Sequence, residues 1–510
     1  MATMRQESSR LSRLLEGYAD IDKAIDCDIN ALSLDSRKLE EGALFFACAG
    51  TRGHGLDYLD QVCQSGVVAV AWEPSDQYPF LPGSATSADV PFIAIDDLSQ
   101  RIGFIADRFY GHPSHDLTVI GITGTDGKTS SSHFLAGALN SSGRLTGLIG
   151  TLGYGLPDQL EASTHTTPDA INVHRLLHEM REQGAQYVVM EVSSHGLDQG
   201  RINGVIVKIA VLTNVSRDHI DYHGNEASYA KAKEKLFHMP GLKCVVINRD
   251  DACGRQWMQT LSDDVQVVLY GMEPCSDSPD NIHDLGMADI RLNRDGISWH
   301  AQGSCGEADL RNHLYGKFNV YNLAAVLATL SELGMPWADA CRHIQDLDTV
   351  PGRMEFYHAP PGRTMPTVII DFAHTPAALE QVLVAIREHG FGRVWCVFGC
   401  GGDRDKGKRP LMGGVAASLA DRIVVTDDNP RTESGDEIIN DIISSISNQQ
   451  NVHVERDRKK AIFLALDSAG KNDVVLIAGK GHEDYQLMGE RKLPFSDADV
   501  VRQWLNGGLH

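Results

Sequence analysis

Glycine, lysine and threonine stand together in the segment Leu117–Leu135, where an apolar run leads into a glycine-rich turn. The turn ends in Gly127, Lys128 and Thr129, and a serine-rich helical start follows. In such a turn backbone N–H groups surround phosphate oxygens, the lysine neutralises the outer phosphates, and the threonine hydroxyl suits Mg²⁺. Five residues rather than the usual four separate Gly121 from the Gly-Lys pair. An ordinary strand-to-helix turn is the alternative, but the pattern favours a nucleoside triphosphate site.

Three further segments carry side chains suited to a metal site or a reactive amine. Glu191 ends an apolar run, where a carboxylate is costly unless it is paired or bound to a metal; a loop carboxylate is the alternative. His219 and His223 are four residues apart without a third ligand at suitable spacing, which favours one histidine near a nucleotide metal over structural zinc. Lys233 falls on the apolar side of a helical pattern, where desolvation would lower its pKa, although a surface lysine with a packed stem also fits.

Polar turns also follow three apolar runs near the C-terminal end of the sequence. Arg404 follows the first, Asp428–Arg431 the second, and Gly479 and Glu483 the third. Each could be a simple polar turn, but the carboxyl ends of parallel strands share one edge of a sheet, so the turns can converge on one ligand. Two arginines and a glutamate suit a ligand with two carboxylates and an amine.

Short apolar runs alternate with helical patterns throughout the chain, which predicts an α/β fold with parallel sheets covered on both faces. The length of 510 residues indicates about three domains. Gly- and Pro-containing breaks at Tyr110–Asp116 and Asp348–Gly352 suit the boundaries. The polar stretch 270–308 is interpreted as a loop or weak β region. The predicted domains are 1–113, 114–350 and 351–510.

The bulk composition limits the class of protein. With 46 Lys and Arg against 68 Asp and Glu, the formal charge is −22, which argues against a protein that coats nucleic acid or an anionic membrane. The ten cysteines form no metal or disulfide pattern, no apolar run approaches the ~20 residues that span a bilayer, and no signal peptide is recognisable. We therefore expect a cytoplasmic protein, and a monomer.

The motifs together resemble the Mur ligases, and the resemblance covers essentially the whole chain. Their order is GITGTDGKTS, EVSSHGLDQGRI, TNVSRDHIDYHG, YAKAKEKLF and GKFNVYNLAA. Many members carry Asn where this chain has Asp126. The resemblance implies a central parallel-sheet P-loop ATPase domain between an N-terminal uridine-nucleotide module and a C-terminal Rossmann-like domain. It also implies an ATP-dependent amide ligase that builds the peptide stem of peptidoglycan.

The resemblance assigns roles to the central residues. Lys128, His219 and Lys233 would be catalytic, and Lys233 would be carbamylated by CO₂, which turns a cation into an oxygen ligand for a hard metal. Mg²⁺ would be held by Thr129, Glu191, His219 and the Lys233 carbamate. ATP would be bound by Gly124, Thr125, Asp126, Gly127, Lys128, Thr129, Ser130, Asn319 and Asn322.

The outer domains would hold the other substrates. The UDP-N-acetylmuramoyl dipeptide would be bound by Leu34, Ser36, Thr51, Arg52, Gly53, His165, Thr166, Thr167, Ser193, Gln199 and Arg201. The string DNPR marks the members that add meso-diaminopimelate, which would be bound by Arg404, Asp428, Asn429, Pro430, Arg431, Gly479 and Glu483. Asp371 and His374 would border the cleft.

The implied reaction joins diaminopimelate to the D-glutamate of the dipeptide through an acyl phosphate. Same-fold alternatives are a ligase adding L-lysine and a folylpolyglutamate-synthase-like enzyme; Arg431 and the uridine-like N-terminal segment argue against both. An ATP-binding module without ligase activity is a third alternative, and the set of Lys128, Glu191 and Lys233 argues against it.

Overall fold

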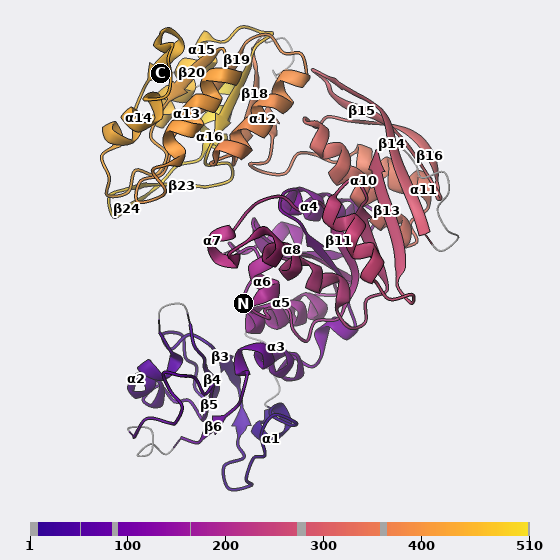
Figure 1. Cartoon of the computed structure of the whole chain (residues 1–510), viewed down its shortest axis with the longest axis vertical. Coiled ribbons are helices and arrows are strands. Elements are labelled where there is room, and N and C mark those ends of the chain that lie inside the picture. The colour runs from indigo at the N-terminus through magenta and orange to yellow at the C-terminus, as the bar shows by residue number, and fades with distance from the viewer. Residues whose placement is uncertain are drawn as a thin grey trace. The chain divides into compact units, whose positions relative to one another are not determined.

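The computed structural model describes residues 9–50, 53–83, 90–163, 165–272, 282–357 and 365–507. The chain forms two compact units, Met1–Leu269 and Tyr270–His510. The first unit runs from indigo to magenta in Figure 1 and the second from there to yellow. Short 3-10 segments occur at Gly55–Tyr58, Pro113–His115, Pro157–Gln159, Lys235–His238, Met258–Thr260 and Gln449–Asn451.

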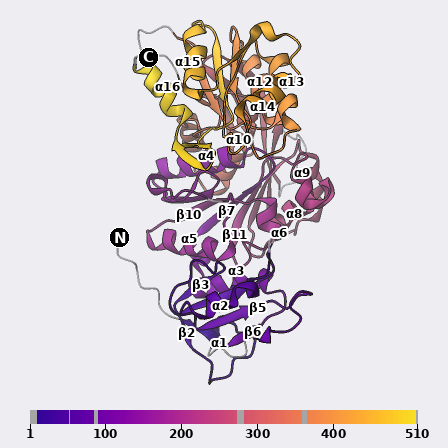
Figure 2. The same cartoon turned by 90° about the vertical axis from the view of Figure 1, so that its left-hand side faces the viewer.

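The first unit begins with a small parallel sheet in the order β3-β4-β5-β6. Alternate residues of β4 face opposite cores: Leu44 and Phe46 pack with helix α3, whereas Phe45 packs with α2. Helix α3 also packs against α5, which joins this sheet to the rest of the unit (Figures 1 and 2). The elements are β1 (Ser9–Arg10), α1 (Leu11–Leu14), β2 (Asp28–Ile29), β3 (Ala31–Ser33), β4 (Ala43–Ala47), α2 (Leu59–Cys63), β5 (Ala69–Trp72), β6 (Phe92–Ala94) and α3 (Leu98–Phe109).

A larger sheet in the same unit has the order β12-β11-β7-β10-β8-β9, parallel except for β9. Its strands are apolar and buried on both faces, as expected of a parallel sheet between helical layers. The elements are β7 (Thr118–Thr123), α4 (Lys128–Ser141), β8 (Thr146–Gly150), β9 (Gly153–Gly155), α5 (Ala170–Glu182), β10 (Tyr187–Glu191), α6 (Ser194–Asp198), β11 (Val207–Leu212), α7 (Ile220–His223), α8 (Glu226–Glu234), β12 (Cys244–Asn248), α9 (Ala252–Trp257) and β13 (Gln266–Met272), which reaches into the second unit.

The second unit opens with an antiparallel sheet of β14 (Ile282–Asn293), β15 (Gly296–Gly303) and β16 (Gly306–Asn312). Helices α10 (Lys317–Glu332) and α11 (Trp337–Gln345) follow. Of the two interpretations of the stretch 270–308, the β region is confirmed for its described part and the loop is not, and the strands are long rather than weak. Polar residues alternate with more buried ones along β16, so one face of the strand is solvated and its side chains are as polar as those of a loop.

A six-stranded sheet in the order β17-β18-β22-β19-β20-β21 ends the chain, with only β17 antiparallel. One face packs against α12, α13 and α14, and the other against α15 and α16 (Figure 1). The elements are β17 (Glu355–Tyr357), β18 (Thr367–Asp371), α12 (Pro376–Glu388), β19 (Val394–Phe398), α13 (Lys408–Leu419), β20 (Arg422–Val425), α14 (Gly435–Ile443), β21 (Val452–Val454), α15 (Arg458–Ser468), β22 (Val474–Ala478), β23 (Tyr485–Met488), β24 (Arg491–Pro494) and α16 (Asp497–Leu505).

The predicted α/β class with parallel sheets covered on both faces is confirmed. The apolar runs predicted to be strands form β5, β6, β7, β10, β11, β12, β18, β19, β20 and β22. Among the described residues, no helix is both long and apolar enough to cross a membrane.

The buried ion pair between Arg458 and Asp497 joins α15 to the start of α16. Its bonds are Nε to Oδ1 and Nη2 to Oδ2, both 2.7 Å, and both side chains are inaccessible to solvent. We expect Asp497→Ala to lower the free energy of unfolding by about 3–5 kcal/mol, because an uncompensated charge stays buried. Urea denaturation measures this. Asp499→Ala, which breaks the exposed pair with Arg502 on the same helix, should cost less than about 1 kcal/mol; equal losses would contradict the prediction.

Candidate active site

The phosphate loop connects β7 to α4, whose first residue is Lys128. Gly124 has φ of 155° and Gly127 has φ of 80°, both in the region that glycine adopts easily. A Cβ on Gly124 would lie 1.8 Å from Thr213 Oγ1, so this position has no room for a side chain. The sequence pattern of strand, glycine turn and helix is therefore realised, and the helix N-terminus faces the turn.

Two lysines meet at this loop on the carbonyl oxygen of Gly124. Lys128 Nζ donates to it at 2.7 Å and to the Thr125 oxygen at 2.9 Å. Lys233 Nζ, from α8, donates to the same Gly124 oxygen at 2.7 Å and lies 4.6 Å from the centre of the Tyr229 ring. Burial first, and then the neighbouring Lys128 ammonium, lowers the pKa of Lys233 well below its ordinary value. Lys233 is 1% exposed, which resolves the alternative of a surface lysine.

The backbone of Asp126, rather than its side chain, is what the loop uses. Thr213 Oγ1 donates to the Asp126 carbonyl oxygen at 2.6 Å, and the Asn214 side chain both accepts from the Asp126 N–H at 3.1 Å and donates to its carbonyl at 3.2 Å. Asp126 itself is exposed. These contacts explain how the position accommodates Asp or Asn, since either backbone is held in the same way.

Glu191 is fully buried at the end of β10 and anchors a hydroxyl network. Its Oε2 accepts from Thr129 Oγ1 at 2.9 Å and from Thr151 Oγ1 at 3.1 Å, and its Oε1 accepts from the Thr151 N–H at 2.8 Å. The carboxylate is thus directly beside the threonine of the phosphate loop. Thr151 was missed from the sequence, although it directly follows β8, at the same edge of the sheet.

The predicted dipeptide residues continue this network. Thr166 Oγ1 lies 3.0 Å from Thr151 Oγ1, while Thr167 Oγ1 lies 2.9 Å from the Glu191 carbonyl oxygen and 3.1 Å from Ser193 Oγ. The Ser193 N–H donates back to Thr167 Oγ1 at 3.0 Å. Three predicted substrate residues are therefore linked to Glu191, Thr166 through Thr151 and Thr167 and Ser193 through the Glu191 backbone carbonyl.

Arg201 extends the network toward α7. Its guanidinium donates to the Thr167 carbonyl oxygen at 2.7 Å and twice to Gln199 Oε1, at 3.0 and 2.6 Å, and Gln199 Nε2 donates to Tyr222 OH at 3.1 Å. Burial lowers the pKa of Arg201. The backbone N–H of His165, the residue before Thr166, donates to Tyr154 OH at 3.2 Å. Tyr222 was not predicted.

His219 lies at the edge of this region, at the N-cap of α7, and is exposed. Its ring centre is 4.8 Å from that of His195 and 6.2 Å from that of Tyr229, whose hydroxyl lies 3.0 Å from Thr125 Oγ1. The structure thus links His219 to the phosphate loop through Tyr229, whereas Thr129 and Glu191 touch directly. Burial, followed by the adjacent His219 and His223, lowers the pKa of His195.

The predicted uridine residues lie after β3 and before α2. Leu34 is exposed although apolar, Gln61 Nε2 donates to the Ser36 carbonyl oxygen at 2.9 Å, and the Gly53 carbonyl accepts from the Gly50 N–H at 2.8 Å. Thr51 and Arg52 lie outside the described residues.

In the second unit, Asn319 and Asn322 lie buried on α10, paired at 3.0 Å, and Asn319 Nδ2 donates to the Tyr315 carbonyl oxygen at 2.8 Å. Asp371, at the end of β18, accepts from the Met354 and Ala373 N–H groups, both at 2.8 Å, and burial raises its pKa. His374 Nδ1 lies 2.9 Å from the Phe372 carbonyl oxygen.

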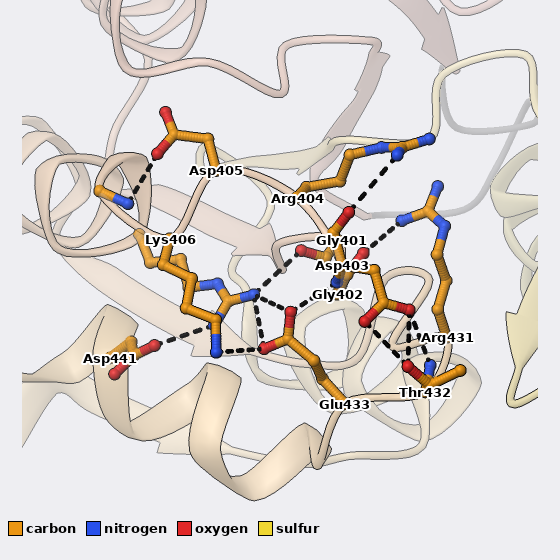
Figure 3. Close-up of polar contacts among 12 residues, drawn as sticks. Gly401, Gly402, Asp403, Arg404, Asp405, Lys406, Arg431, Thr432, Glu433 and Asp441 are labelled. Carbon is orange, nitrogen blue, oxygen red and sulfur yellow. Dashed lines mark hydrogen bonds and ion pairs between the residues drawn. The ribbon is translucent and has the colours of Figure 1, made fainter. Parts of the chain in front are cut away.

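The three polar turns near the C-terminal end do converge, since β22, β19 and β20 are neighbours in the sheet. Arg404 and Arg431 flank Gly401: a Cβ on that glycine would lie 2.9 Å from Arg431 Nη1 and 3.7 Å from Arg404 Cγ. In Figure 3 the two side chains run in different directions and their guanidinium groups end in the same part of the view. Two cations placed together favour an anionic ligand.

The remaining turn residues meet at Lys480, a fully buried lysine that sequence reasoning missed. Its Nζ lies 3.0 Å from Glu483 Oε2, 3.2 Å from Asn429 Oδ1 and 3.6 Å from Asp428 Oδ1. Asn429 Nδ2 also donates to Glu483 Oε2 at 3.0 Å. Gly479 has φ of 114° and approaches Asp428, while Pro430 follows Asn429 in the same turn. The glycines on either side of Lys480 are the sequence feature from which its place in a polar turn could have been predicted.

Comparison with known proteins shows the family of the chain. Over 97% of the chain and 98% of the relative, it is 47% identical to UDP-N-acetylmuramoyl-L-alanyl-D-glutamate–2,6-diaminopimelate ligase of Alkalilimnicola ehrlichii. The chain belongs to the Mur ligase family. Residues 28–110 match the Mur ligase family catalytic domain, 122–330 the Mur ligase middle domain, and 352–481 the Mur ligase glutamate ligase domain. Like other Mur ligases, the chain is an ATP-dependent ligase.

Further relatives and solved structures extend the similarity. The ligase of the same name from Coxiella burnetii is 44% identical over 97% of this chain and 99% of its own length. A solved structure of a protein with that name is 32% identical, with a TM-score of 0.71 over 99% of this chain and 100% of the other. A folylpolyglutamate synthase from Mycobacterium tuberculosis is 19% identical, with a TM-score of 0.59 over 80% and 95% of the two chains, and shares the fold.

The backbone contacts at Asp126 predict unequal effects for two substitutions. Asp126→Asn should change kcat/KM for ATP less than about threefold, because the held backbone is unchanged. Thr213→Val should lower it by at least about tenfold, because the Asp126 carbonyl loses its hydroxyl donor and the loop loosens. Steady-state kinetics with varied ATP measure both. A larger loss in Asp126→Asn than in Thr213→Val would contradict the backbone role.

Proposed function

We propose that this Mur ligase joins meso-2,6-diaminopimelate to the D-glutamate of UDP-N-acetylmuramoyl-L-alanyl-D-glutamate, with ATP converted to ADP and phosphate. The product is a precursor in peptidoglycan synthesis. The observation that supports diaminopimelate as the amino-acid substrate is the pair of arginines, Arg404 and Arg431, on either side of Gly401. Diaminopimelate has a second carboxylate where lysine has only a hydrogen atom, so a cationic pair favours it, whereas with lysine the pair would face the distal ammonium without that carboxylate.

The phosphate loop and Glu191 fit a nucleotide with its divalent cation. Thr129 and Glu191 offer a hydroxyl and a carboxylate in contact, and oxygen ligands of this kind suit Mg²⁺. Mg²⁺ would be held by Thr129 and Glu191, joined by His219 and carbamylated Lys233, and would neutralise phosphate charge. Lys128 would bind the β- and γ-phosphates, and the other loop residues, with Asn319 and Asn322, the rest of ATP.

A carbamate on Lys233 would resolve an electrostatic conflict in the loop. Two ammonium groups share the Gly124 oxygen, and burial favours the neutral form of Lys233. Only the neutral amine reacts with CO₂: the nitrogen bonds to carbon, a proton leaves, and a carboxylate-like anion forms. The anion would then face the Lys128 cation, so a repulsive pair would become an attractive one.

The reaction has two steps. The γ-carboxylate oxygen of the D-glutamate attacks the γ-phosphorus of ATP, and ADP leaves; the diaminopimelate amine then attacks the acyl carbon, releasing phosphate and a proton. Lys128 neutralises charge on the transferring group, as in other phosphoryl transfers. Arg201, held by the Gln199 and Thr167 oxygens, would orient the substrate carboxylate beside Thr166 and Ser193. These residues act mainly by positioning.

The proposal keeps three functional domains, at residues 1–113, 114–350 and 351–510, and the three family matches fall inside them. The first would bind the uridine diphosphate part, through Leu34, Ser36 and the segment to Gly53. The third would bind diaminopimelate. Since ATP and UDP-linked precursors are cytoplasmic metabolites, we place the enzyme in the cytoplasm. A monomer suffices, because one chain carries every proposed binding residue.

Substrate-dependent phosphate release tests this function. We expect phosphate from ATP only when both the UDP-linked dipeptide and diaminopimelate are present. L-Lysine and ornithine should give kcat/KM at least about 100-fold lower, because a polar site rejects a ligand that leaves its charges unpaired. Higher activity with lysine would make the enzyme a lysine ligase. Phosphate release that ignores the uridine nucleotide would refute the proposed substrate.

Lys233→Ala tests the carbamate. We expect kcat to fall about 100-fold and to recover in part with a short carboxylic acid, which replaces the missing carboxylate. Lys231→Ala, an exposed lysine on the same helix, is the control and should stay close to wild type. Full activity of Lys233→Ala without additive would refute the idea, and ¹³C-bicarbonate labelling followed by NMR reports the carbamate directly.

A further inference from the structure

Two loops carry the arginines proposed to bind diaminopimelate, and each loop contains a residue in an uncommon conformation. Asp403, beside Arg404, has φ of 53°, and Arg431 has φ of 52°. Non-glycine residues rarely occupy this left-handed region unless surrounding contacts hold them there. The contacts between the two loops are drawn in Figure 3.

Asp403 reaches from the first loop to the second. Its Oδ2 accepts from the Thr432 N–H at 3.1 Å, and the Thr432 hydroxyl donates to Oδ1 at 2.9 Å and to Oδ2 at 2.8 Å. One carboxylate therefore satisfies both the backbone and the side chain of the residue after Arg431. This contact adds to the backbone bonds of Arg431 itself, whose N–H donates to the Leu487 carbonyl oxygen at 3.1 Å and whose carbonyl accepts from the Gly489 N–H at 2.8 Å.

Glu433 reaches back from the second loop to the first. Its Oε1 accepts from the Asp403 N–H at 2.5 Å. Buried Arg409 supports it through Nη2, which lies 3.1 Å from both carboxylate oxygens, and Lys406 Nζ lies 3.1 Å from Oε2. The Asp403 N–H, together with the Lys406 and Arg409 cations, lowers the pKa of Glu433 to about 2. Glu433 thus remains a charged acceptor throughout the neutral pH range.

The loop backbones also touch directly. The Gly402 N–H donates to the Asn429 carbonyl at 2.9 Å, and Arg431 Nη1 donates to the Gly402 carbonyl at 2.8 Å. A Cβ on Gly402 would lie 1.9 Å from the Pro430 carbonyl oxygen, so a glycine is required there. The two loops are thus in backbone contact at Gly402, with no room for a side chain between them. Asp403 and Glu433 add a side-chain hydrogen bond in each direction across this contact.

We propose that Asp403 and Glu433 are positioning residues that fix the two loops to one another and thereby set the direction in which Arg404 and Arg431 meet the amino-acid substrate. This inference rests on the proposed function for the identity of that substrate. Neither carboxylate touches the substrate in this role. They select diaminopimelate indirectly, because an arginine that turns away leaves the second carboxylate unbound and removes the advantage of diaminopimelate over lysine.

The test compares amino-acid preference in matched variants. Asp403→Ala should raise KM for diaminopimelate at least about tenfold, leave KM for ATP within about twofold, and lower the preference for diaminopimelate over lysine at least about tenfold. Glu433→Gln, which keeps an acceptor but loses its charge, should shift both values in the same direction by less. Asp403→Asn should recover most of the preference, because asparagine tolerates the left-handed region and still accepts from Thr432.

Asp441→Asn is the matched control. Asp441 also contacts Arg409, at 2.9 Å, but makes its contact from α14 rather than from either loop. It should leave the amino-acid preference unchanged. If Asp441→Asn and Glu433→Gln lowered the preference equally, or if Asp403→Ala kept it, the positioning role would be overturned.

Hydrogen exchange without substrate separates this inference from the proposed function. The backbone amides at positions 403 and 432 should exchange at least about tenfold faster in Asp403→Ala or Glu433→Gln than in Asp441→Asn. Equal exchange in all variants would overturn the loop contact even if diaminopimelate is the substrate. Wild-type enzyme that does not use diaminopimelate would overturn the proposed function, while faster exchange would still support the loop contact.

Discussion

The carbonyl oxygen of Gly124 accepts hydrogen bonds from two lysines, and the central site depends on this arrangement. Lys128 is contributed by α4 and Lys233 by α8, so the contact ties both helices to the phosphate loop. Lys233 is buried and Lys128 is partly buried, so an ammonium on both would be repulsive unless anions are nearby. Phosphate groups are such anions. The lowered pKa of Lys233 reduces the repulsion in the loop, and bound negative charge would reduce it further.

The second unit also contains closely placed cationic side chains, and their charges are compensated in two different ways. Lys480 is fully buried, but Glu483, Asp428 and Asn429 surround it, so its charge is compensated within the protein. Arg404 and Arg431 instead lie side by side around a glycine and contact backbone carbonyl oxygens. The compensated lysine supports the structure, whereas the paired arginines are available to a ligand. Net charge of −22 over the chain conceals this local concentration of cations.

Sequence reasoning predicted the elements and the turns well, because apolar runs and glycine breaks reflect local physics. It placed Glu191 and Thr129 near one another, and they are in contact. It missed Thr151 and Glu433, since each acquires its role from a partner 30 or more residues away, and it missed Lys480, although Glu483 is only three residues further on. It left β14–β16 open between a loop and a weak β region, because the solvated face of β16 is as polar as a loop. The presence of Asp at position 126 is explained by the hydrogen bonds of its backbone, which the sequence does not reveal.

The close approach of Gly402 to Pro430 has a consequence for how amino-acid preference changes during evolution. Backbone rests on backbone there, so neither loop can gain bulk or change its path while the other stays as it is. A new path for one loop at this point therefore requires a matching new path for the other, so we expect the two loops to change together when amino-acid preference changes.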